Sequence, residues 1–431
     1  MKLPRALPCL LAGLLLAYPA MSADVFRVQK RLYKVGPMPC AIAARDLNDD
    51  GLPEIVTCDR GQMRGPREEK PANDEISLLI AQADGGYIRR TPSLRTGFAP
   101  YAVALVNIDA LRWPDIVTVS FHAAGSPNIH LFLNLRSEDL FKPMPFSLPD
   151  EDLTYTYELP AGLLPYLRQE DGDRKPLFAK PGLTSLAVTD LNGDGLRDLV
   201  TTAWASDVVA VVPGHAEKHF DLEATRFYPI TGAPRDVVLA DFDKDGHLDA
   251  AVVLYAADSV VLLRGDGALG FEETARFGTR GKLPARLRAG DINGDGILDL
   301  AIAHRDADDL ISLFYGAGDF VFDTSQLVTI GKDPAVLEHD LRDLVMEDLN
   351  GDGKTDLATA CNASGEVVIL LNQSDPGKFR LSFKREGHRF PEGKPAALTA
   401  ADLDGDEDTD LAVALWEADA VGLLLNTEKR D

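Results

Sequence analysis

One acidic segment recurs along the chain, and the residue types in it are those that bind hard cations. Its clearest copy reads DLNGDGLRD, from Asp190 to Asp198, with oxygen-bearing side chains at positions 1, 3, 5 and 9. The glycine at position 6 permits a sharp turn, and the main-chain carbonyl of position 7 can point inward. Because clustered carboxylates on a tight loop repel one another, the loop requires a cation. This donor set suits Ca²⁺, which takes about six to eight oxygen ligands, better than Mg²⁺ or a transition metal.

Six copies of the segment carry enough oxygen ligands to predict five or six bound Ca²⁺ ions. Two of these copies depart from the pattern, because the first copy ends in Glu54 and the last has Glu407 in place of the glycine. A seventh, degraded copy keeps only Asn107, Asp109 and Asp115, so it is expected to bind no metal. The candidate ligands, with position 7 contributing its carbonyl oxygen, are Asp46, Asn48, Asp50, Leu52, Glu54, Asp190, Asn192, Asp194, Leu196, Asp198, Asp241, Asp243, Asp245, His247, Asp249, Asp291, Asn293, Asp295, Ile297, Asp299, Asp348, Asn350, Asp352, Lys354, Asp356, Asp402, Asp404, Asp406, Asp408 and Asp410.

The residues around the acidic segment exclude an EF-hand. An EF-hand requires a bidentate glutamate at position 12 and a helix on each side of the loop. Position 12 is threonine, valine or isoleucine in all six copies. Apolar, β-branched runs precede and follow the segment, as in RDVVLAD and DLVTTAW. These runs are typical of buried strands, so each acidic loop is expected to join two strands of a hairpin.

The spacing of the copies predicts the architecture. The motif starts at residues 46, 107, 190, 241, 291, 348 and 402, and each start opens a unit with four strand-like runs. Seven four-stranded units predict an all-β, seven-bladed β-propeller of antiparallel blades. The last unit ends after its third strand, so the N-terminal strand is expected to complete it and leave no open sheet edge. The expected boundaries are 24–36 for the closing strand and 37–98, 99–181, 182–232, 233–282, 283–332, 333–393 and 394–431 for blades 1 to 7.

The chain resembles the FG-GAP/VCBS repeat family, whose best-known propeller is that of the integrin α chains. The resemblance rests on the spacing DxNxDGxxD and covers residues 24–431. Weaker matches to the family pattern are the GAP sequence at 232–234 and the Phe277–Gly278 pair. The resemblance implies a propeller with Ca²⁺ in the hairpin loops of one face and with ligands bound at the opposite face.

A second set of residues follows each motif start by fourteen positions, where the second strand of a unit ends. By blade geometry these residues circle the channel mouth on the face opposite the acidic loops. Their aromatic rings and guanidinium groups suit stacking on sugars or anchoring of a protein partner. The alternative is that the aromatic side chains pack between blades. The set consists of Arg60, Phe121, Trp204, Tyr255, Arg305, Asn362 and Trp416.

Three insertions are expected on the same face as this second set. They cover residues 59–74, 149–181 and 336–342, and all fall in connections away from the acidic loops. Clustering of long connections on one face favours a binding surface over random variation in loop length, because propeller function tends to lie in rim loops.

The N-terminus and the cysteines bear on the cellular compartment. Residues 1–23 have a basic start, a short apolar run and small residues at the end, which predicts a signal peptide and a secreted or periplasmic protein. No later stretch is long enough for a membrane span. Cys40 and Cys58 flank the first acidic loop and could face each other across a hairpin. A disulfide and two free thiols remain alternatives for this pair.

Charge and motifs narrow the functional classes. The net charge is −24, from 68 acidic and 44 basic residues, which disfavours nucleic-acid binding. The chain has no nucleophile elbow, HExxH motif or Walker loop. We therefore expect an exported, calcium-stabilised, monomeric binding module for a protein or glycan. Two alternatives remain, a polysaccharide lyase or hydrolase on the same scaffold and a structural subunit of a surface assembly.

Overall fold

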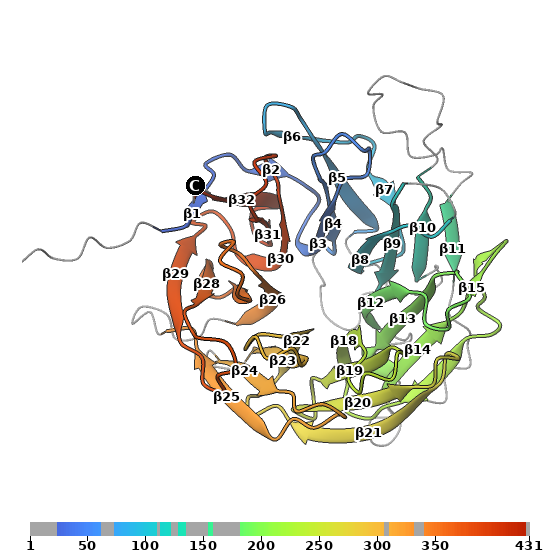
Figure 1. Cartoon of the computed structure of the whole chain (residues 1–431). Helices are drawn as coiled ribbons and strands as arrows, with labels where there is room; N and C mark the ends of the chain where they lie inside the picture. Colours follow the sequence, from blue (N-terminus) through green and yellow to red (C-terminus); the bar gives the residue numbers. More distant parts are fainter. Residues whose placement is uncertain are drawn as a thin grey trace, which may run out of the picture.

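The computed structural model of the chain describes residues 24–61, 73–109, 113–121, 128–134, 154–157, 182–305, 310–331 and 340–427. Its strands form seven antiparallel blades that follow one another in chain order around a central channel (Figure 1). The predicted seven-bladed β-propeller is therefore confirmed. The expected signal peptide and most of the three expected insertions lie outside the described residues.

Each blade begins with a strand at the channel and proceeds outward. Blade 1 contains β3 (Pro39–Arg45), β4 (Glu54–Asp59), β5 (Glu75–Ala81), β6 (Tyr87–Arg89) and β7 (Leu94–Arg95). Blade 2 contains β8 (Pro100–Val106), β9 (Asp115–Ser120), β10 (Ile129–Phe132) and β11 (Thr154–Tyr157). Blade 3 contains β12 (Leu183–Thr189), β13 (Asp198–Ala203), β14 (Val208–Val212) and β17 (Arg226–Pro229), with a side hairpin of β15 (Gly214–His215) and β16 (His219–Phe220).

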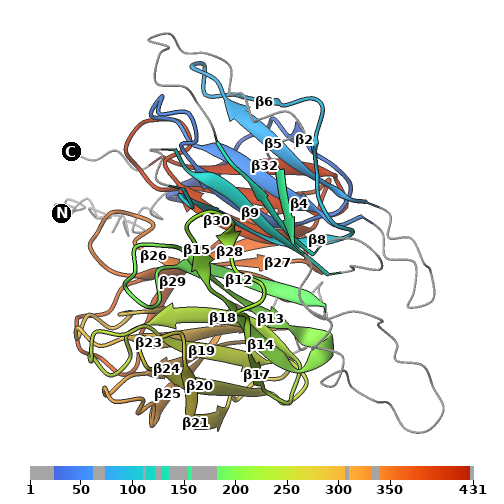
Figure 2. The same ribbon diagram turned by 90° about the vertical axis from the view of Figure 1, so that its right-hand side faces the viewer.

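The remaining blades follow the same order. Blade 4 contains β18 (Pro234–Ala240), β19 (Asp249–Leu254), β20 (Ser259–Gly265) and β21 (Phe271–Gly278). Figure 2 shows the ring edge-on, with these four strands following one another toward the outer edge. Blade 5 contains β22 (Pro284–Gly290), β23 (Asp299–His304), β24 (Leu310–Tyr315) and β25 (Thr324–Thr329). Blade 6 contains β26 (Leu341–Glu347), β27 (Asp356–Cys361), β28 (Glu366–Asn372) and β29 (Phe383–Arg389). Blade 7 contains β30 (Pro395–Ala401), β31 (Asp410–Leu415) and β32 (Ala420–Asn426), and β1 (Phe26–Val28) and β2 (Tyr33–Lys34) complete it.

The middle strands of the blades carry the core. Every residue of β19 and β31 is buried, because each blade is covered on both faces by its neighbours. Val209 of blade 3 shares one apolar cluster with Val252 and Val261 of blade 4. Each buried valine or leucine contributes about 1.5–3 kcal/mol through removal of apolar surface from water. The outer strand β21 instead has only partly buried and exposed residues, as expected of a strand at the solvent-facing edge.

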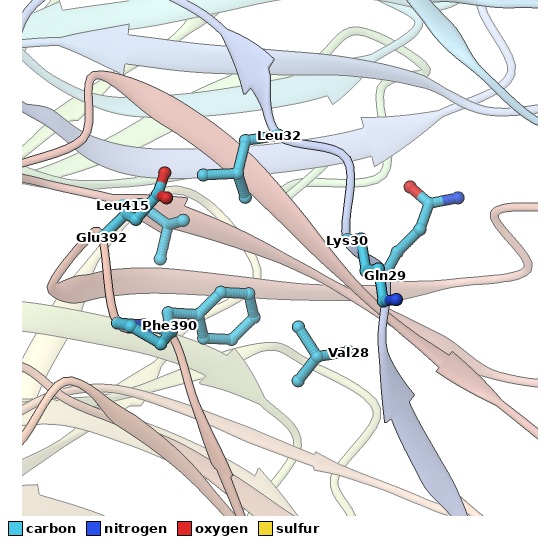
Figure 3. Close-up of a pocket in the computed structure, with 8 residues that line it drawn as sticks. Val28, Gln29, Lys30, Leu32, Phe390, Glu392 and Leu415 are labelled. Atoms are coloured by element: carbon cyan, nitrogen blue, oxygen red, sulfur yellow. The ribbon is translucent and has the colours of Figure 1, made fainter.

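The N-terminal segment closes the ring. Both β1 and β2 pair with β32, so that Phe26 lies opposite Asn426 and Tyr33 lies opposite Val421. The predicted completion of the last blade by the N-terminal strand is therefore confirmed. A surface pocket of about 320 Å³ lies beside this segment. Figure 3 shows Val28, Leu32 and Phe390 around it, where the chain leaves the edge of blade 7 between β1 and β2.

Glu386 of blade 6 fastens the closing segment. Its carboxylate accepts the N–H of Val25 at 3.0 and 3.2 Å and lies 2.8 Å from Nζ of Lys384. Burial raises the pKa of Glu386, but the interactions with His388, whose Nε2 lies 3.6 Å from the carboxylate, and with Lys384 outweigh burial and bring the pKa to about 2. The charged form is therefore favoured in the folded state.

We predict that Glu386→Gln lowers the free energy of unfolding by about 1–3 kcal/mol at pH 7, because the substitution removes a charged acceptor from buried donors. Since the folded pKa of Glu386 is depressed, its contribution persists above the ordinary carboxyl pKa of 4.5 and is lost as the pH falls toward about 2. Urea denaturation of both proteins at pH 7 and at pH 3 measures the gap between them. The gap should narrow at pH 3, and an equal gap at both values would contradict this role.

Two expectations differ from the structure. The sequence predicts one long insertion over 149–181, whereas β11 lies within that range and pairs with β10 as the fourth strand of blade 2. Cys40 and Cys58 are free thiols, so the disulfide alternative is wrong. Cys40 lies at a register shift between β3 and β4, and its Sγ is 3.4 Å from the carbonyl oxygen of Pro100 in blade 2. Burial raises the pKa of Cys40 to about 11, which leaves the thiol unreactive at neutral pH.

Candidate functional site

The acidic loops join the first and second strands of the blades, and their own carboxylates fold them. In the clearest copy, Asp190 accepts the N–H of Gly193 at 2.7 Å and that of Gly195 at 2.9 Å. Asp194 accepts the N–H of Leu196 at 2.8 Å. Equivalent bonds recur in the acidic loops of blades 5 and 6. Positions 1 and 5 therefore hold each of these loops in a common conformation.

Position 9 ties each loop to the end of the third strand. Asp356 is fully buried, and it accepts the N–H of Leu349 at 3.0 Å and that of Asn372 at 2.6 Å. Asp115 of the degraded copy makes the equivalent bonds at 2.8 and 2.7 Å. Burial raises the pKa of Asp356 to about 7 and that of Asp115 to about 6. Because the degraded copy keeps this arrangement, position 9 has a structural role that does not depend on a cation.

Three carboxylates converge in the loops of blades 4 and 7. In each of these loops, one oxygen from each of positions 1, 3 and 9 lies within 4.8 Å of the other two. In blade 7, burial raises the pKa of Asp404, and the negative charges of Asp406 and Asp402 raise it further, as repulsion between crowded carboxylates would. A divalent cation would relieve that repulsion, so the donor set fits Ca²⁺. The residues are Asp241, Asp243 and Asp249 in blade 4 and Asp402, Asp404 and Asp410 in blade 7.

These two loops also carry individual features. In blade 4, Nε of Arg264 lies 2.9 Å from Oδ2 of Asp243, so a guanidinium shares one of the converging carboxylates. In blade 7, Glu407 has a φ of 70°, in the left-handed region that the other copies fill with glycine. Its N–H still donates to Asp402 at 2.9 Å. The left-handed conformation costs about 1–2 kcal/mol for a residue with a Cβ, but the loop keeps its geometry.

The second predicted set lies at the other end of the second strand. This strand has six residues in β4 and in β19, which corresponds to about 20 Å between the acidic loop and the channel mouth. Each of the seven residues donates its N–H, at 2.8–3.3 Å, to a carbonyl in the turn that enters its blade. Six of the seven accepting residues have a positive φ. The accepting residues, in blade order, are Met38, Ala99, Gly182, Ala233, Leu283, Asp340 and Lys394.

Arginine and aromatic side chains meet at the mouth. The guanidinium of Arg60 lies 4.4 Å from the ring centroid of Trp416 and 5.8 Å from that of Tyr101. Arg235 lies 5.8 Å from the same Tyr101 ring and 5.1 Å from Tyr255. We call these residues and their neighbours the mouth ring, which consists of Arg60, Tyr101, Phe121, Trp204, Arg235, Tyr255, Arg305, Arg342 and Trp416.

The rest of the mouth ring is linked in the same way. The rings of Phe121 and Trp204 are 6.0 Å apart, and Phe121 also lies 5.6 Å from Tyr101. Arg305 and Arg342 share Asp340, with contacts of 3.1 and 2.8 Å. The structure therefore brings six of the seven predicted residues into one connected set. Asn362 differs, because it is buried and its Nδ2 donates to the carbonyl of Pro395 at 3.0 Å.

A family model matches two parts of the chain that contain acidic loops. Residues 190–252 and 348–413 match the model of a family described as an FG-GAP-like repeat. The chain contains FG-GAP-like repeats. No curated protein matches the sequence significantly.

Solved structures share the fold of these FG-GAP-like repeats. BBS1N in complex with ARL6DN is 13% identical, with 94% of this chain and 97% of that chain covered and a TM-score of 0.56. Virginiamycin B lyase from Staphylococcus aureus is 11% identical, with 93% and 99% covered and a TM-score of 0.56. A putative 6-phosphogluconolactonase from Bacteroides fragilis is 15% identical, with 83% and 86% covered and a TM-score of 0.53. At these identities the likeness shows the fold alone.

Further residues lie at the channel that the sequence alone did not indicate. The inner strand of each blade has a register shift, and the residue six positions before each acidic segment lies in it. Three of these residues, Tyr101, Arg235 and Arg342, belong to the mouth ring. These residues lie six positions before each acidic segment and often directly after a proline, and this constant spacing is a signal in the sequence that could have revealed them. The seven residues are Cys40, Tyr101, Thr184, Arg235, Ala285, Arg342 and Ala396.

The next residues along the inner strands form a polar belt inside the channel. We define this belt as Ser185, Asp236, Arg286, Arg288 and Asp343. Ser185 of blade 3 donates to Asp236 of blade 4 at 2.7 Å, and Nη1 of Arg288 in blade 5 lies 3.5 Å from Asp236. Arg286 and Arg288 both contact Asp343 of blade 6, at 3.1 and 3.2 Å. Asp343 in turn accepts a main-chain N–H from blade 7 at 2.9 Å. The belt therefore joins five consecutive blades.

The mouth ring carries excess positive charge among the described residues. Burial raises the pKa of Tyr101, but the charges of Arg235 and Arg60 together outweigh burial, and its pKa lies below the ordinary value. Nη2 of Arg235 also donates to the Tyr101 hydroxyl at 2.8 Å. The mouth ring contains four arginines, and Asp340 is the acid that contacts two of them. Such a surface attracts an anionic or hydrogen-bond-accepting ligand.

Proposed function

We propose that the protein is an exported, calcium-stabilised β-propeller that binds a protein or glycan partner at its channel mouth. The mouth ring is the observation that carries this proposal. It gathers four arginines and five aromatic residues at one end of the channel, in a chain whose net charge is −24. Arginine, tyrosine and tryptophan are the residues that most often dominate binding energy at protein interfaces.

The proposal gives the acidic loops a structural role. The converging carboxylates of blades 4 and 7 fit Ca²⁺, and the other four copies offer an asparagine oxygen at position 3 in place of the aspartate. The cations would stabilise the hairpins that lead into the second strands. These hairpins lie about 20 Å from the mouth ring, at the opposite end of the same strands. Export rests on the expected signal peptide at 1–23. Within the described part of the chain, no helix is both long and apolar enough to cross a bilayer.

Capture of a partner by immobilised protein tests this proposal. The wild-type protein should retain a ligand from a glycan panel or from the exported proteins of its source, and Trp204→Ala/Trp416→Ala should lose it. Ile88→Ala is a matched control, because Ile88 is 57% exposed on the outer strand β6. Equal capture by the wild type and the tryptophan variant would contradict a binding site at the mouth.

A second candidate function is catalysis on an acidic polysaccharide, by a lyase or a hydrolase. One observation favours it, because arginine charges lower the pKa of Tyr101 and could prepare its hydroxyl as a base. The channel carboxylates Asp236 and Asp343 fit this function less well, since both are engaged by arginine and main-chain N–H groups. Turnover of a polyuronate that Tyr101→Phe abolishes would replace the binding-module proposal. A structural subunit would show neither turnover nor capture that depends on the mouth ring.

A further inference from the structure

We propose that the mouth ring holds a carboxylate group that a protein partner inserts between Arg60 and Arg235. This inference rests on the proposed function and specifies its ligand. Both guanidinium groups lie 5.8 Å from the ring centroid of Tyr101, so they are neighbours of the same aromatic ring at the channel mouth.

The two arginines have hydrogen-bonding capacity that the described residues do not use. Nε of Arg60 and Nε of Arg235 are buried and have no hydrogen-bond partner. Among the described residues, no carboxylate forms an ion pair with either side chain, whereas Arg305 and Arg342 share Asp340. A buried donor without a partner costs about 1–3 kcal/mol, and more when it is charged. A carboxylate would satisfy both donors and offset both charges.

The aromatic rings orient the arginines for this role. A guanidinium stacks on an aromatic ring through its flat face. Its N–H groups lie in the plane of the guanidinium, so stacking leaves them available to donate hydrogen bonds to a ligand. Arg60 is held over Trp416 at 4.4 Å, and Arg235 is held over Tyr255 at 5.1 Å. The arginines therefore lose little side-chain entropy on binding, and planar carboxylates match their geometry.

The charges and the covered rings favour a protein partner over an acidic polysaccharide. A polyanion would approach against the net charge of −24, whereas a single carboxylate contacts only the positive mouth. The ring of Trp416 is covered by Arg60 and by Arg342, which lies 4.9 Å from its centroid, so this indole does not offer an open platform for sugar stacking. The channel pocket of about 260 Å³ is a separate feature, because the polar belt with Asp236 and Asp343 lines it and Arg60 and Arg235 do not.

Carboxylate probes test the inference without knowledge of the partner. The melting temperature of the calcium-saturated protein is measured in sodium acetate and in sodium chloride at equal ionic strength. We expect acetate to raise the melting temperature of the wild type and of the control Arg276→Gln, whose arginine pairs with Glu273 on the outer strand β21. The response should be lost in Arg60→Gln/Arg235→Gln and partly kept in Arg60→Lys/Arg235→Lys. A wild type that responds equally to both salts, or a glutamine variant that keeps the acetate response, would overturn the inference.

Three further probes separate the sources of the carboxylate. These are N-acetylated pentaglycine with a free C-terminus, the same peptide as an amide, and galacturonate. We expect the free peptide to bind at least tenfold more tightly than either of the others. Tighter binding of galacturonate would assign the site to an acidic sugar and overturn the choice of a protein partner.

The same glutamine variant distinguishes this inference from the proposed function. If Arg60→Gln/Arg235→Gln still captures the partner while Trp204→Ala/Trp416→Ala loses it, the carboxylate inference is wrong and the binding site stands. If both variants capture the partner as well as the wild type does, the proposed function itself is wrong.

Discussion

Removal of divalent cations with EDTA should lower the melting temperature of this protein by about 10 °C or more. Each occupied loop stabilises the folded state by about 2.7 kcal/mol when free Ca²⁺ is a hundredfold above the dissociation constant, and five or six loops contribute together. Repulsion between the clustered carboxylates should make the melting temperature depend strongly on the Ca²⁺ concentration. In blade 7, burial and neighbouring charge already raise the pKa of Asp404 in the absence of a cation. Differential scanning calorimetry in Ca²⁺ and in EDTA measures the shift.

Loop variants show whether the shift arises at the acidic loops. Asp348→Ala removes the first ligand of the acidic loop in blade 6. It should reduce the difference in melting temperature between Ca²⁺ and EDTA by the contribution of about one site. Asp109→Asn, in the degraded copy, is the matched control and should leave that difference unchanged. Mg²⁺ at the same concentration should restore less stability than Ca²⁺ does, because it demands a smaller octahedral site. A melting temperature that is the same in Ca²⁺ and in EDTA means that the loops do not bind the ion.

Replacement of Asp343 by alanine should lower the free energy of unfolding by about 3–5 kcal/mol. The side chain of Asp343 is 6% exposed and lies 3.1 Å from Nε of Arg286, whose side chain is 12% exposed. The substitution leaves the guanidinium of Arg286 buried with only the longer contact to Asp236, at 3.9 Å. It also removes the acceptor for the N–H of Leu398, and with it a link between blades 6 and 7.

Two further variants, one at an exposed ion pair and one conservative change at Asp343, serve as references for this loss of stability. Asp74→Ala breaks an ion pair of similar length, 3.0 Å, with Arg95, but the arginine side chain is 69% exposed. Its effect should stay below about 1 kcal/mol, because solvent screens surface pairs. Asp343→Asn keeps a hydrogen-bond acceptor but loses the charge. Its loss of unfolding free energy should therefore lie between those of Asp343→Ala and Asp74→Ala. Urea denaturation in saturating Ca²⁺ measures all three proteins, and a loss below 1 kcal/mol for Asp343→Ala would show that the belt is not a major source of stability.

The repeated acidic motif was sufficient to predict the architecture. Its seven starts define the seven blades, and the missing fourth strand of the last unit predicts the closure that β1 and β2 make with β32. The fixed offset of fourteen residues also predicts a connected set at the mouth, because a six-residue strand of constant length carries the chain from the acidic loop to that end. Local spacing within one blade is therefore readable from the sequence.

Contacts between blades were not predictable in the same way. Tyr101, Arg235 and Arg342 reach the mouth because register shifts turn them there, and a strand pattern of period two does not reveal such shifts. Arg60 lies over Trp416 only because blades 1 and 7 become neighbours when the ring closes. The weak pattern TYTY, which forms β11, lies among charged and proline-rich residues that resemble a loop. Cys40 contacts Pro100 of the next blade, and the spacing of the two cysteines within one hairpin does not reveal a contact between blades.

Hydroxyl-radical footprinting of the protein with its captured partner tests most directly whether function lies at the channel mouth. Tyrosine and tryptophan side chains react readily when they are accessible, so Tyr255, Trp204 and Trp416 report on the mouth ring. We predict that the partner reduces oxidation of these three side chains at least severalfold and leaves oxidation of Phe379, which is 53% exposed, unchanged. Protection of Phe379 with no change at the mouth ring would contradict it.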